Sequence, residues 1–222
     1  MEKIKEAYNQ KPNEYYTSSR QDMISFIPKT TKTLVDVGCG EGYFAKAFKD
    51  IANAQVHGVE MNPISAAKAS KILDKVYIGD IDSQLANLPD NFYDAITCND
   101  VLEHLFDPYQ TLKNLTAKLT SEGVIIASIP NFRFFRNLID ILYKKDWEYK
   151  SSGILDFTHL RFFTQKSIIR MFEEAGYEII KCQGITKSKS LRPYIYNFLT
   201  LGAFGKDSFF LHFAVVAKKL RD

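Results

Sequence analysis

The sequence predicts an α/β protein built on a doubly wound, mostly parallel sheet. Short runs rich in Val and Ile alternate with segments whose apolar residues recur at helical spacing, and a glycine-rich turn follows the first run. Strands that each lead into a helix form βαβ units, which build a parallel sheet buried on both faces. Because these crossovers are right-handed, helices are expected on both sides of the sheet.

Five runs are expected to be strands of the front half, because each is short, mostly apolar and followed by turn residues. They are residues 33–37, 54–60, 75–78, 93–98 and 123–129. Helical spacing over 43–48, 64–72 and 109–119 places helices between them. A further helix is expected around 15–26.

The pattern changes after Pro130. Residues 131–152 predict a helix followed by an aromatic loop. Thr164 is the expected N-cap of a helix that runs to about Ala175 and is stopped by Gly176. Two last strands are expected at 177–182 and 212–217, and the stretch 187–210 reads as irregular, aromatic and basic.

Composition excludes several classes of protein. Apolar residues make up 45% and charged residues 25% of the 222, as in ordinary soluble globular chains. Cys39, Cys98 and Cys182 lie far apart with no CxxC, which argues against a disulfide framework and favours a reducing, cytoplasmic location. The first residues lack the apolar stretch of a signal peptide, and no apolar segment is long enough to span a membrane.

Charge is unevenly distributed. Residues 1–130 hold 13 Lys and Arg against 17 Asp and Glu, a net −4, whereas residues 131–222 hold 16 against 9, a net +7. One interpretation is chance and solvated faces. The other is that the back half meets an anionic partner, such as a phosphorylated small molecule, a lipid headgroup or a nucleic acid.

The turn after the first strand, V-D-V-G-C-G-E-G-Y-F over residues 35–44, is the most informative run. A dinucleotide site wants G-x-G-x-x-G, but the third glycine falls at 42 and Tyr43 occupies its place. The carboxylates of Asp36 and Glu41 would repel a pyrophosphate. They suit a ligand that carries an ammonium and a sulfonium.

Polar residues follow the next strands at the same edge of the sheet. Glu60, 22 residues beyond Gly38, can accept both hydroxyls of a ribose. Asp80 stands where an adenine amino group could donate to it. The fourth strand leads into N-D-V-L-E-H-L, beginning at Asn99. Together these positions form a nucleoside-binding set.

These residues resemble the class I S-adenosylmethionine-dependent methyltransferases. D-V-G-C-G-E-G is similar to their first motif, V-E-M-N-P (59–63) to the second, G-D-I (79–81) to the third, and F-Y-D-A-I-T-C-N-D-V-L-E-H-L-F-D-P (92–108) to the fourth-strand motif. The resemblance spans roughly residues 15–185. It implies a Rossmann-like sheet of seven strands, mostly parallel with an antiparallel last strand, and a small helical, aromatic lobe.

The resemblance also implies a division of one domain. Residues 1–30 would be an N-terminal helical lid, 31–130 the S-adenosylmethionine-binding core, 131–163 an inserted acceptor lobe, and 164–222 the C-terminal helix and last strands. A monomer or a homodimer is expected.

A set of residues is expected to bind the donor. Asp36, Gly38 and Gly40 would line its methionine moiety, Glu60 its ribose, Met61 and Ile81 its adenine ring, Asp80 the adenine amino group, and Asn99 the ammonium; Cys39 and His104 complete the set. Each has a structural alternative. The glycines could serve close packing, Met61 could be core and Asp80 a helix N-cap.

The run G-I-L-D-F-T-H-L-R-F-F-T (153–164), with S-I-P-N-F (128–132), is similar to a bacterial subgroup linked with glycan and cell-surface polysaccharide biosynthesis. The ubiquinone-biosynthesis O-methyltransferases are a more distant relation. The resemblance implies methyl transfer to a small molecule or glycan, which could be anionic, and most readily to a hydroxyl oxygen.

An acceptor hydroxyl benefits from a general base, and His159 is the best candidate, with Asp156 placed to orient its ring. The alternative is that both residues pin the loop. Arg161 could pair with an acceptor phosphate or carboxylate, or form a structural salt bridge. Phe132 and Trp147 could stack on the acceptor, or be core. Tyr16, with Tyr15 and Arg20, could form a lid, or pack at the edge of the domain.

Other functions are less well supported. The histidines lack metal-site spacing, so no metal is expected. Nucleic acid is not expected as a substrate, because N-P-P-Y and D-P-P-Y do not follow the fourth strand. The basic, aromatic stretch 187–210 could touch a membrane surface, though packing or dimerisation explains it too. A nicotinamide-dependent oxidoreductase and a non-catalytic, S-adenosylmethionine-binding regulator or partner subunit remain as alternatives.

Overall fold

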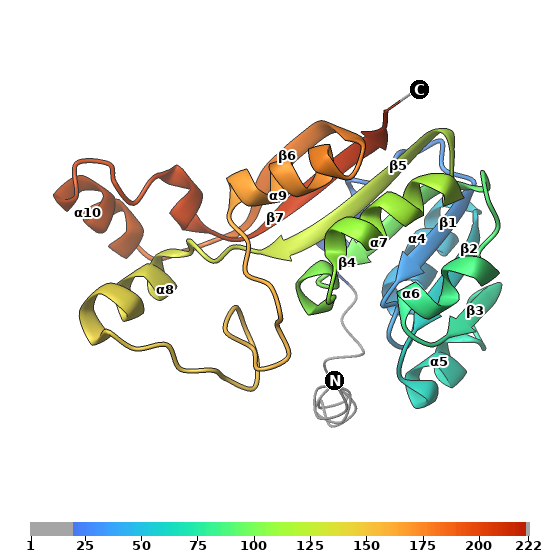
Figure 1. Cartoon of the computed structure of the whole chain (residues 1–222), viewed down its shortest axis with the longest axis horizontal. Coiled ribbons are helices and arrows are strands. Elements are labelled where there is room, and N and C mark those ends of the chain that lie inside the picture. The colour runs from blue at the N-terminus through green and yellow to red at the C-terminus, as the bar shows by residue number, and fades with distance from the viewer. Residues whose placement is uncertain (1–19, 221–222) are drawn as a thin grey trace.

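Seven strands form one sheet in the order β3-β2-β1-β4-β5-β7-β6. The computed structural model describes residues 20–220 (Figure 1). The strands are β1 (Thr33–Val37), β2 (Gln55–Glu60), β3 (Lys75–Ile78), β4 (Tyr93–Asn99), β5 (Leu119–Pro130), β6 (Tyr177–Lys187) and β7 (Phe210–Lys219). Strands β1 to β5 pair in parallel, whereas β7 runs antiparallel to both neighbours, β5 and β6. The predicted sheet is confirmed.

Helices connect the strands and cover both faces of the sheet (Figure 1). They are α3 (Gln21–Ile24), α4 (Tyr43–Ala52), α5 (Pro63–Ala69), α6 (Ile81–Gln84), α7 (Pro108–Leu115), α8 (Phe135–Ile139), α9 (Gln165–Glu174) and α10 (Arg192–Leu199). Short 3-10 turns follow α6, β4 and α7 and precede β7, and a π-helical turn, Asp140–Lys144, extends α8. Within the described residues, no helix has the length and apolar character needed to cross a bilayer.

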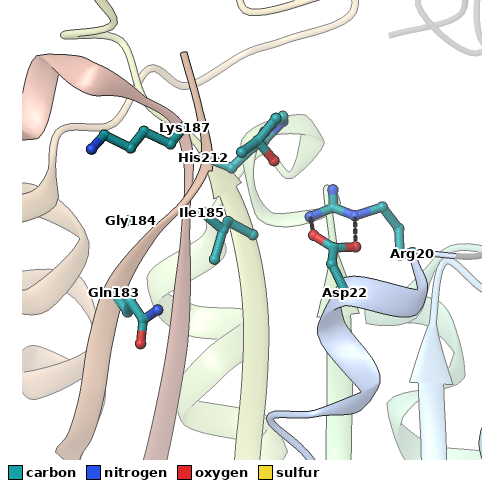
Figure 2. A pocket seen from close by; sticks show the side chains of 8 residues that line it. Arg20, Asp22, Gln183, Gly184, Ile185, Lys187 and His212 are labelled. Carbon is teal, nitrogen blue, oxygen red and sulfur yellow. Dashed lines mark hydrogen bonds and ion pairs between the residues drawn. The ribbon is translucent and has the colours of Figure 1, made fainter. Parts of the chain in front are cut away.

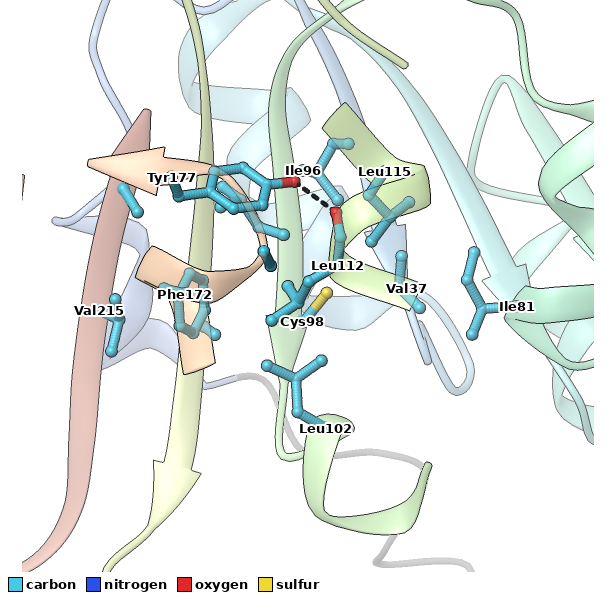
Figure 3. Packing of buried hydrophobic residues seen from close by; sticks show 14 of the residues in the cluster. Val37, Ile81, Ile96, Cys98, Leu102, Leu112, Leu115, Phe172, Tyr177 and Val215 are labelled. Atoms are coloured by element: carbon cyan, nitrogen blue, oxygen red, sulfur yellow. Dashed lines mark hydrogen bonds between the residues drawn. The ribbon is translucent and has the colours of Figure 1, made fainter. Parts of the chain in front are cut away.

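The core lies in two layers that the sheet separates. Alternate side chains of β5 enter different layers, Ile125 and Ala127 on one side and Ile126 on the other. The first layer packs α7 and α9 against the sheet, and Figure 3 shows Phe172 of α9 and Leu112 of α7 among the side chains of this layer. The second layer packs α3 and α4 on the opposite face. Two covered faces explain why the central strands are almost wholly apolar.

Helix α9 begins and ends as its sequence predicts. Thr164 caps it, accepting from the Ser167 N–H while the Ser167 hydroxyl accepts from the Thr164 N–H, a capping box. Gly176, just beyond the helix, has φ +89°, a left-handed conformation that glycine adopts at little cost.

Two expectations need correction or fall outside the described chain. The stretch 187–210 is not irregular throughout, because it contains α10 with Pro193 in its first turn. Of the helix expected around 15–26, the described part is the single turn α3, and Tyr15 and Tyr16 lie outside the described residues.

The chain leaves the sheet after β5 and returns before α9. A bridge between Asn131 and Phe163 closes this excursion at its base. Arg133 ties it to the turn after α10, since its guanidinium pairs with Asp207 and donates to the Phe204 carbonyl. In Figure 1, α8 and α10 both project beyond the same end of the sheet.

Candidate functional site

The glycine turn after β1 brings bare backbone to the carboxyl edge of the sheet. Gly38 has φ +72°, and a Cβ there would lie 2.6 Å from a methyl carbon of Val101. A larger residue would therefore be strained and would also collide with the segment that follows β4. The Gly38 and Cys39 N–H groups both donate to the Val59 carbonyl, which fastens the turn to β2.

Glu60, at the end of β2, binds the backbone of the glycine turn. Its carboxylate accepts from the Gly40 N–H (2.8 Å) and the Asn62 N–H (2.7 Å), and the residue is 1% exposed. Burial raises the pKa of Glu60, although these N–H groups oppose the rise. The Met61 N–H is a third backbone donor that lowers this pKa. A carboxylate can accept about four hydrogen bonds, so capacity remains for about one from a ribose hydroxyl.

Asp36, at the end of β1, is a second buried carboxylate at this edge. The Thr97 hydroxyl donates to it over 2.6 Å. Burial raises the pKa of Asp36 to about 7, the Thr97 hydrogen bond lowers it, and the charge of Glu60 raises it. Two neighbouring acids that are costly to ionise favour a cationic ligand, which would stabilise both charges.

One further observation, independent of the two carboxylates, indicates that the residues at this edge fit S-adenosylmethionine. Both polar atoms of the Asn99 side chain are buried, and no hydrogen-bond partner for them occurs within residues 20–220. A buried amide without partners costs free energy. An amino-acid moiety offers both the ammonium donor and the carboxylate acceptor that this amide lacks.

The remaining donor-side residues differ in how they lie. Met61 is half-buried directly after β2. Asp80 is the N-cap of α6 and accepts from the Ser83 N–H, which is the structural alternative to an adenine contact. Ile81 is 4% exposed and belongs to the core layer of α7 and α9.

Cys39 packs inward, and its expected place in the donor-binding set stays a prediction. Its sulfur fills the space beside Gly58, where an added Cβ would approach it to 2.6 Å. The Cys39 N–H donates to Val59 and its carbonyl accepts from Gly42. The sulfur, the N–H and the carbonyl of Cys39 thus all contact the protein itself.

The end of β4 and the loop of the lobe meet at an acid–imidazole cluster, made of Glu103, His104 and His159. One ligand-type atom of each lies within 4.8 Å of the others, so the three could hold a metal ion. The Leu160 and Arg161 N–H groups donate to the Glu103 carbonyl, which joins the two segments. Sequence spacing gave no sign of this cluster, because 55 residues separate His104 from His159.

Glu103 is the unusual member of the cluster. It is 1% exposed, and neither carboxylate oxygen has a hydrogen-bond partner among the described residues. Burial raises the pKa of Glu103 well above its ordinary value, and the charge of Asp100 adds to the rise. The His159 Nε2 atom lies 3.9 Å from one Glu103 oxygen.

The orientation of His159 is fixed in a way that the sequence did not indicate. Its Nδ1 atom lies 2.9 Å from the Ile154 carbonyl oxygen, which can only accept, so Nδ1 carries the proton. Asp156 instead accepts from the N–H and the hydroxyl of Thr158 (2.8 and 2.7 Å). The Ile154 carbonyl therefore fixes the ring tautomer, and Asp156 shapes the turn that carries the ring.

Aromatic side chains of the lobe gather next to His159. Phe132 stacks on Trp147, with ring centroids 5.1 Å apart, and Phe162 contacts both rings edge-on. Trp147 keeps 40% of its surface exposed. Arg161 is exposed and donates to the Phe106 carbonyl, so it has a structural bond in place of the salt bridge considered above.

The sequence did not predict a cavity at the same edge, beyond β5. Its volume is about 650 Å³, and Arg20, Asp22, His212 and residues 183–187 line it. Figure 2 shows Arg20 and Asp22 facing the end of β6 and the start of β7. Arg20 also pairs with Asp100, which accepts from the Ser128 hydroxyl.

Comparisons with known proteins agree with this geometry. Residues 8–182 match the family described as "Methyltransferase domain". A ubiquinone biosynthesis O-methyltransferase of Saccharophagus degradans is 28% identical over 173 residues, 75% of this chain and 72% of the relative. The predicted link to a glycan-biosynthesis subgroup gains no support from this relative.

Two solved structures share the fold. A SAM dependent methyltransferase from Archaeoglobus fulgidus is 20% identical with a TM-score of 0.70, covering 94% of this chain and 95% of that one. A SAM-dependent methyltransferase of Thermotoga maritima, described as a possible histamine N-methyltransferase, is 18% identical with a TM-score of 0.66, covering 97% and 99%. The chain belongs to the methyltransferase-domain family and is an S-adenosylmethionine-dependent methyltransferase.

Proposed function

We propose that this enzyme methylates a hydroxyl oxygen of a small, ring-containing molecule and that His159 is its general base. The name of the Saccharophagus degradans relative, an O-methyltransferase, supports oxygen as the methylated atom. The partly exposed Trp147 ring, stacked on Phe132, offers a flat apolar surface to the ring of an acceptor.

The donor is held by the residues at the ends of β1, β2 and β4. Asp36 and Asn99 meet its amino-acid moiety, and Glu60 accepts from its ribose. When bound, S-adenosylmethionine supplies an electrophilic methyl group on a sulfonium. The protein's task is then to orient the acceptor oxygen and to remove its proton.

His159 has the protonation pattern that this task requires, and this observation carries the proposal. Its Nδ1–H donates to the Ile154 carbonyl, which makes Nε2 the basic nitrogen of the ring. The pKa of Glu103 is raised, but the positive charge of the imidazolium that forms would favour ionisation of this carboxyl group, 3.9 Å from Nε2. Asp156 acts as a positioning residue through its bonds to Thr158.

Replacing His159 with Asn tests the role of Nε2. The Asn amide can still donate to the Ile154 carbonyl but has no group equivalent to Nε2. We expect kcat with a panel of phenols and catechols to fall about 10²–10⁴-fold, the usual contribution of a general base. The dissociation constant of S-adenosylmethionine, measured by calorimetry, should remain unchanged.

A matched control replaces Asp156 with Asn, which removes charge but keeps the acceptor atom for Thr158. This variant should retain most of its activity if Asp156 acts only on the turn. Wild-type kcat in the His159→Asn variant would refute His159 as the base. Transfer to amines and never to hydroxyls would refute the proposed acceptor class.

A further inference from the structure

Helix α10 presents an apolar stripe to water instead of to the core. Leu191, Ile195, Phe198 and Leu199 follow the spacing i, i+4, i+7 and i+8, which places them on one face of a helix. Their exposed fractions are 74%, 54%, 81% and 68%, and Leu201 just beyond them is 97% exposed. Scattered exposed apolar residues are ordinary, but a continuous stripe of this kind marks a binding surface.

Other side chains of α10 pack against the segment that follows the helix. A lack of packing partners for α10 therefore does not explain why the stripe faces water. The Tyr194 ring lies 4.5 Å from that of Phe209, and Tyr196 stacks on Phe204 at 5.7 Å. Arg133 donates to the Phe204 carbonyl over 2.7 Å, which links this segment to the lobe. The helix therefore contacts its own segment through Tyr194 and Tyr196, while its stripe of Leu, Ile and Phe side chains faces water.

The charge around the stripe has one sign. The segment from residue 187 to residue 206 contains Lys187, Lys189, Arg192 and Lys206 and no Asp or Glu. The next residue, Asp207, is paired with Arg133 at 2.6 Å and so does not offset these cations. The Lys187 ammonium lies over the Tyr194 ring, at the edge of the helix.

The π-helical turn of the lobe adds exposed apolar residues at the same end of the molecule, with charges of both signs beside them. Leu142 and Tyr143 are 60% and 70% exposed, and Lys144 and Lys145 follow them. Figure 1 shows that α8, which this turn extends, and α10 are the elements projecting at this end, away from α5 and β3. Lys144 pairs with Asp140 at 2.8 Å, so this turn adds apolar surface to the projection, whereas the excess of positive charge comes from the α10 segment.

We propose that this projection binds the surface of an anionic phospholipid bilayer, with the α10 stripe lying among the headgroups and upper acyl chains. Helices with an apolar face flanked by Lys and Arg bind in this way, and both features contribute to affinity. A second copy of the chain is a poorer occupant. In a two-fold interface the same cations would face one another and repel.

The test is co-sedimentation of the full chain with vesicles of phosphatidylcholine alone and of phosphatidylcholine mixed with phosphatidylglycerol. We expect binding to the mixed vesicles that weakens as salt is added. The variant Phe198→Ser with Leu201→Ser should lose roughly tenfold or more in partitioning. Replacing both Lys187 and Arg192 with Gln should lose about fivefold for each charge removed.

The matched control is Ile51→Ser, because Ile51 on α4 is 74% exposed but lies outside the projection. This variant should bind vesicles like the wild type, and circular dichroism should show that all variants keep the native fold. Equal binding by Phe198→Ser with Leu201→Ser, or no binding of folded wild type to the mixed vesicles, would overturn the proposal. A dimer that this double variant dissociates, without vesicle binding, would assign the stripe to a second copy.

Discussion

Replacing Asp36 with Asn should stabilise the ligand-free enzyme at alkaline pH and weaken the binding of S-adenosylmethionine. The substitution keeps the shape of the side chain and the oxygen to which the Thr97 hydroxyl donates, 2.6 Å away. It removes only the ability to ionise. Because Asp36 is 3% exposed, the charge that it carries above its pKa is formed in a poorly solvated place.

The size of the effect follows from the pKa of Asp36, which burial raises from 3.8 to about 7. Each unit corresponds to about 1.36 kcal/mol, so the difference amounts to roughly 4 kcal/mol as an upper bound. The folded state holds this proton more tightly than the unfolded state. The stabilising contribution is therefore complete below the unfolded pKa of 3.8 and is lost as the pH rises through about 7.

Thermal unfolding of both proteins at acidic and alkaline pH measures this difference. In a chain of this length, 1 kcal/mol shifts Tm by roughly 2–4 °C. The Asn variant should unfold at a higher temperature than the wild type above about pH 8, and the two should converge below about pH 4. Calorimetry should show weaker binding of S-adenosylmethionine to the variant, because its ammonium loses an anionic partner.

A control substitution separates burial from a general effect of removing a carboxylate. Asp50→Asn, on the exposed side of α4, breaks a surface pair with Lys46 and should change stability by less than about 1 kcal/mol at any pH. If the Asp36 variant is no more stable than the wild type at alkaline pH, then burial does not destabilise the ionised form of Asp36.

Three further predictions test the turn, the base and the core. Gly38→Ala should lower the free energy of unfolding by about 1–3 kcal/mol more than Gly153→Ala does. Both glycines have positive φ, but only at Gly38 would the added Cβ collide with Val101. Adding Val101→Ala to the Gly38→Ala variant should recover part of that loss. EDTA should leave kcat unchanged if His159 acts as the base without a metal, whereas loss of turnover that Mg²⁺ restores would assign the acid–imidazole cluster to a metal. Tyr177→Phe removes a buried 2.8 Å hydrogen bond to a helix carbonyl and should lower the free energy of unfolding by about 1 kcal/mol in urea titrations.

Local sequence patterns were sufficient to predict most of the sheet. The runs 33–37 and 75–78 coincide with β1 and β3, because strands between helices are apolar and end abruptly at glycine or Asp. Strand β6 extends to Lys187, five residues beyond its prediction. Its outer half, Gln183–Lys187, has no strong apolar pattern, and pairing with β7 holds it.

Local patterns indicate the place of the donor-side residues more directly than that of the acceptor side, and their roles stay predictions. Asp36, Glu60 and Asn99 each lie at or just beyond the end of a predicted strand, and parallel strands bring their ends to one edge. The contact between Glu103 and His159 depends on the fold of the lobe, which no local pattern encodes. The bond from His159 to the Ile154 carbonyl likewise arises from a loop conformation.

The position of β7 has a consequence for biosynthesis. This strand occupies residues 210–219 yet lies between β5 and β6, which are both made before it. Until residues 210–219 have left the ribosome, β5 has an unpaired edge along a strand whose second half is wholly buried in the folded protein. An exposed apolar edge invites aggregation, so the nascent chain needs protection until β7 emerges.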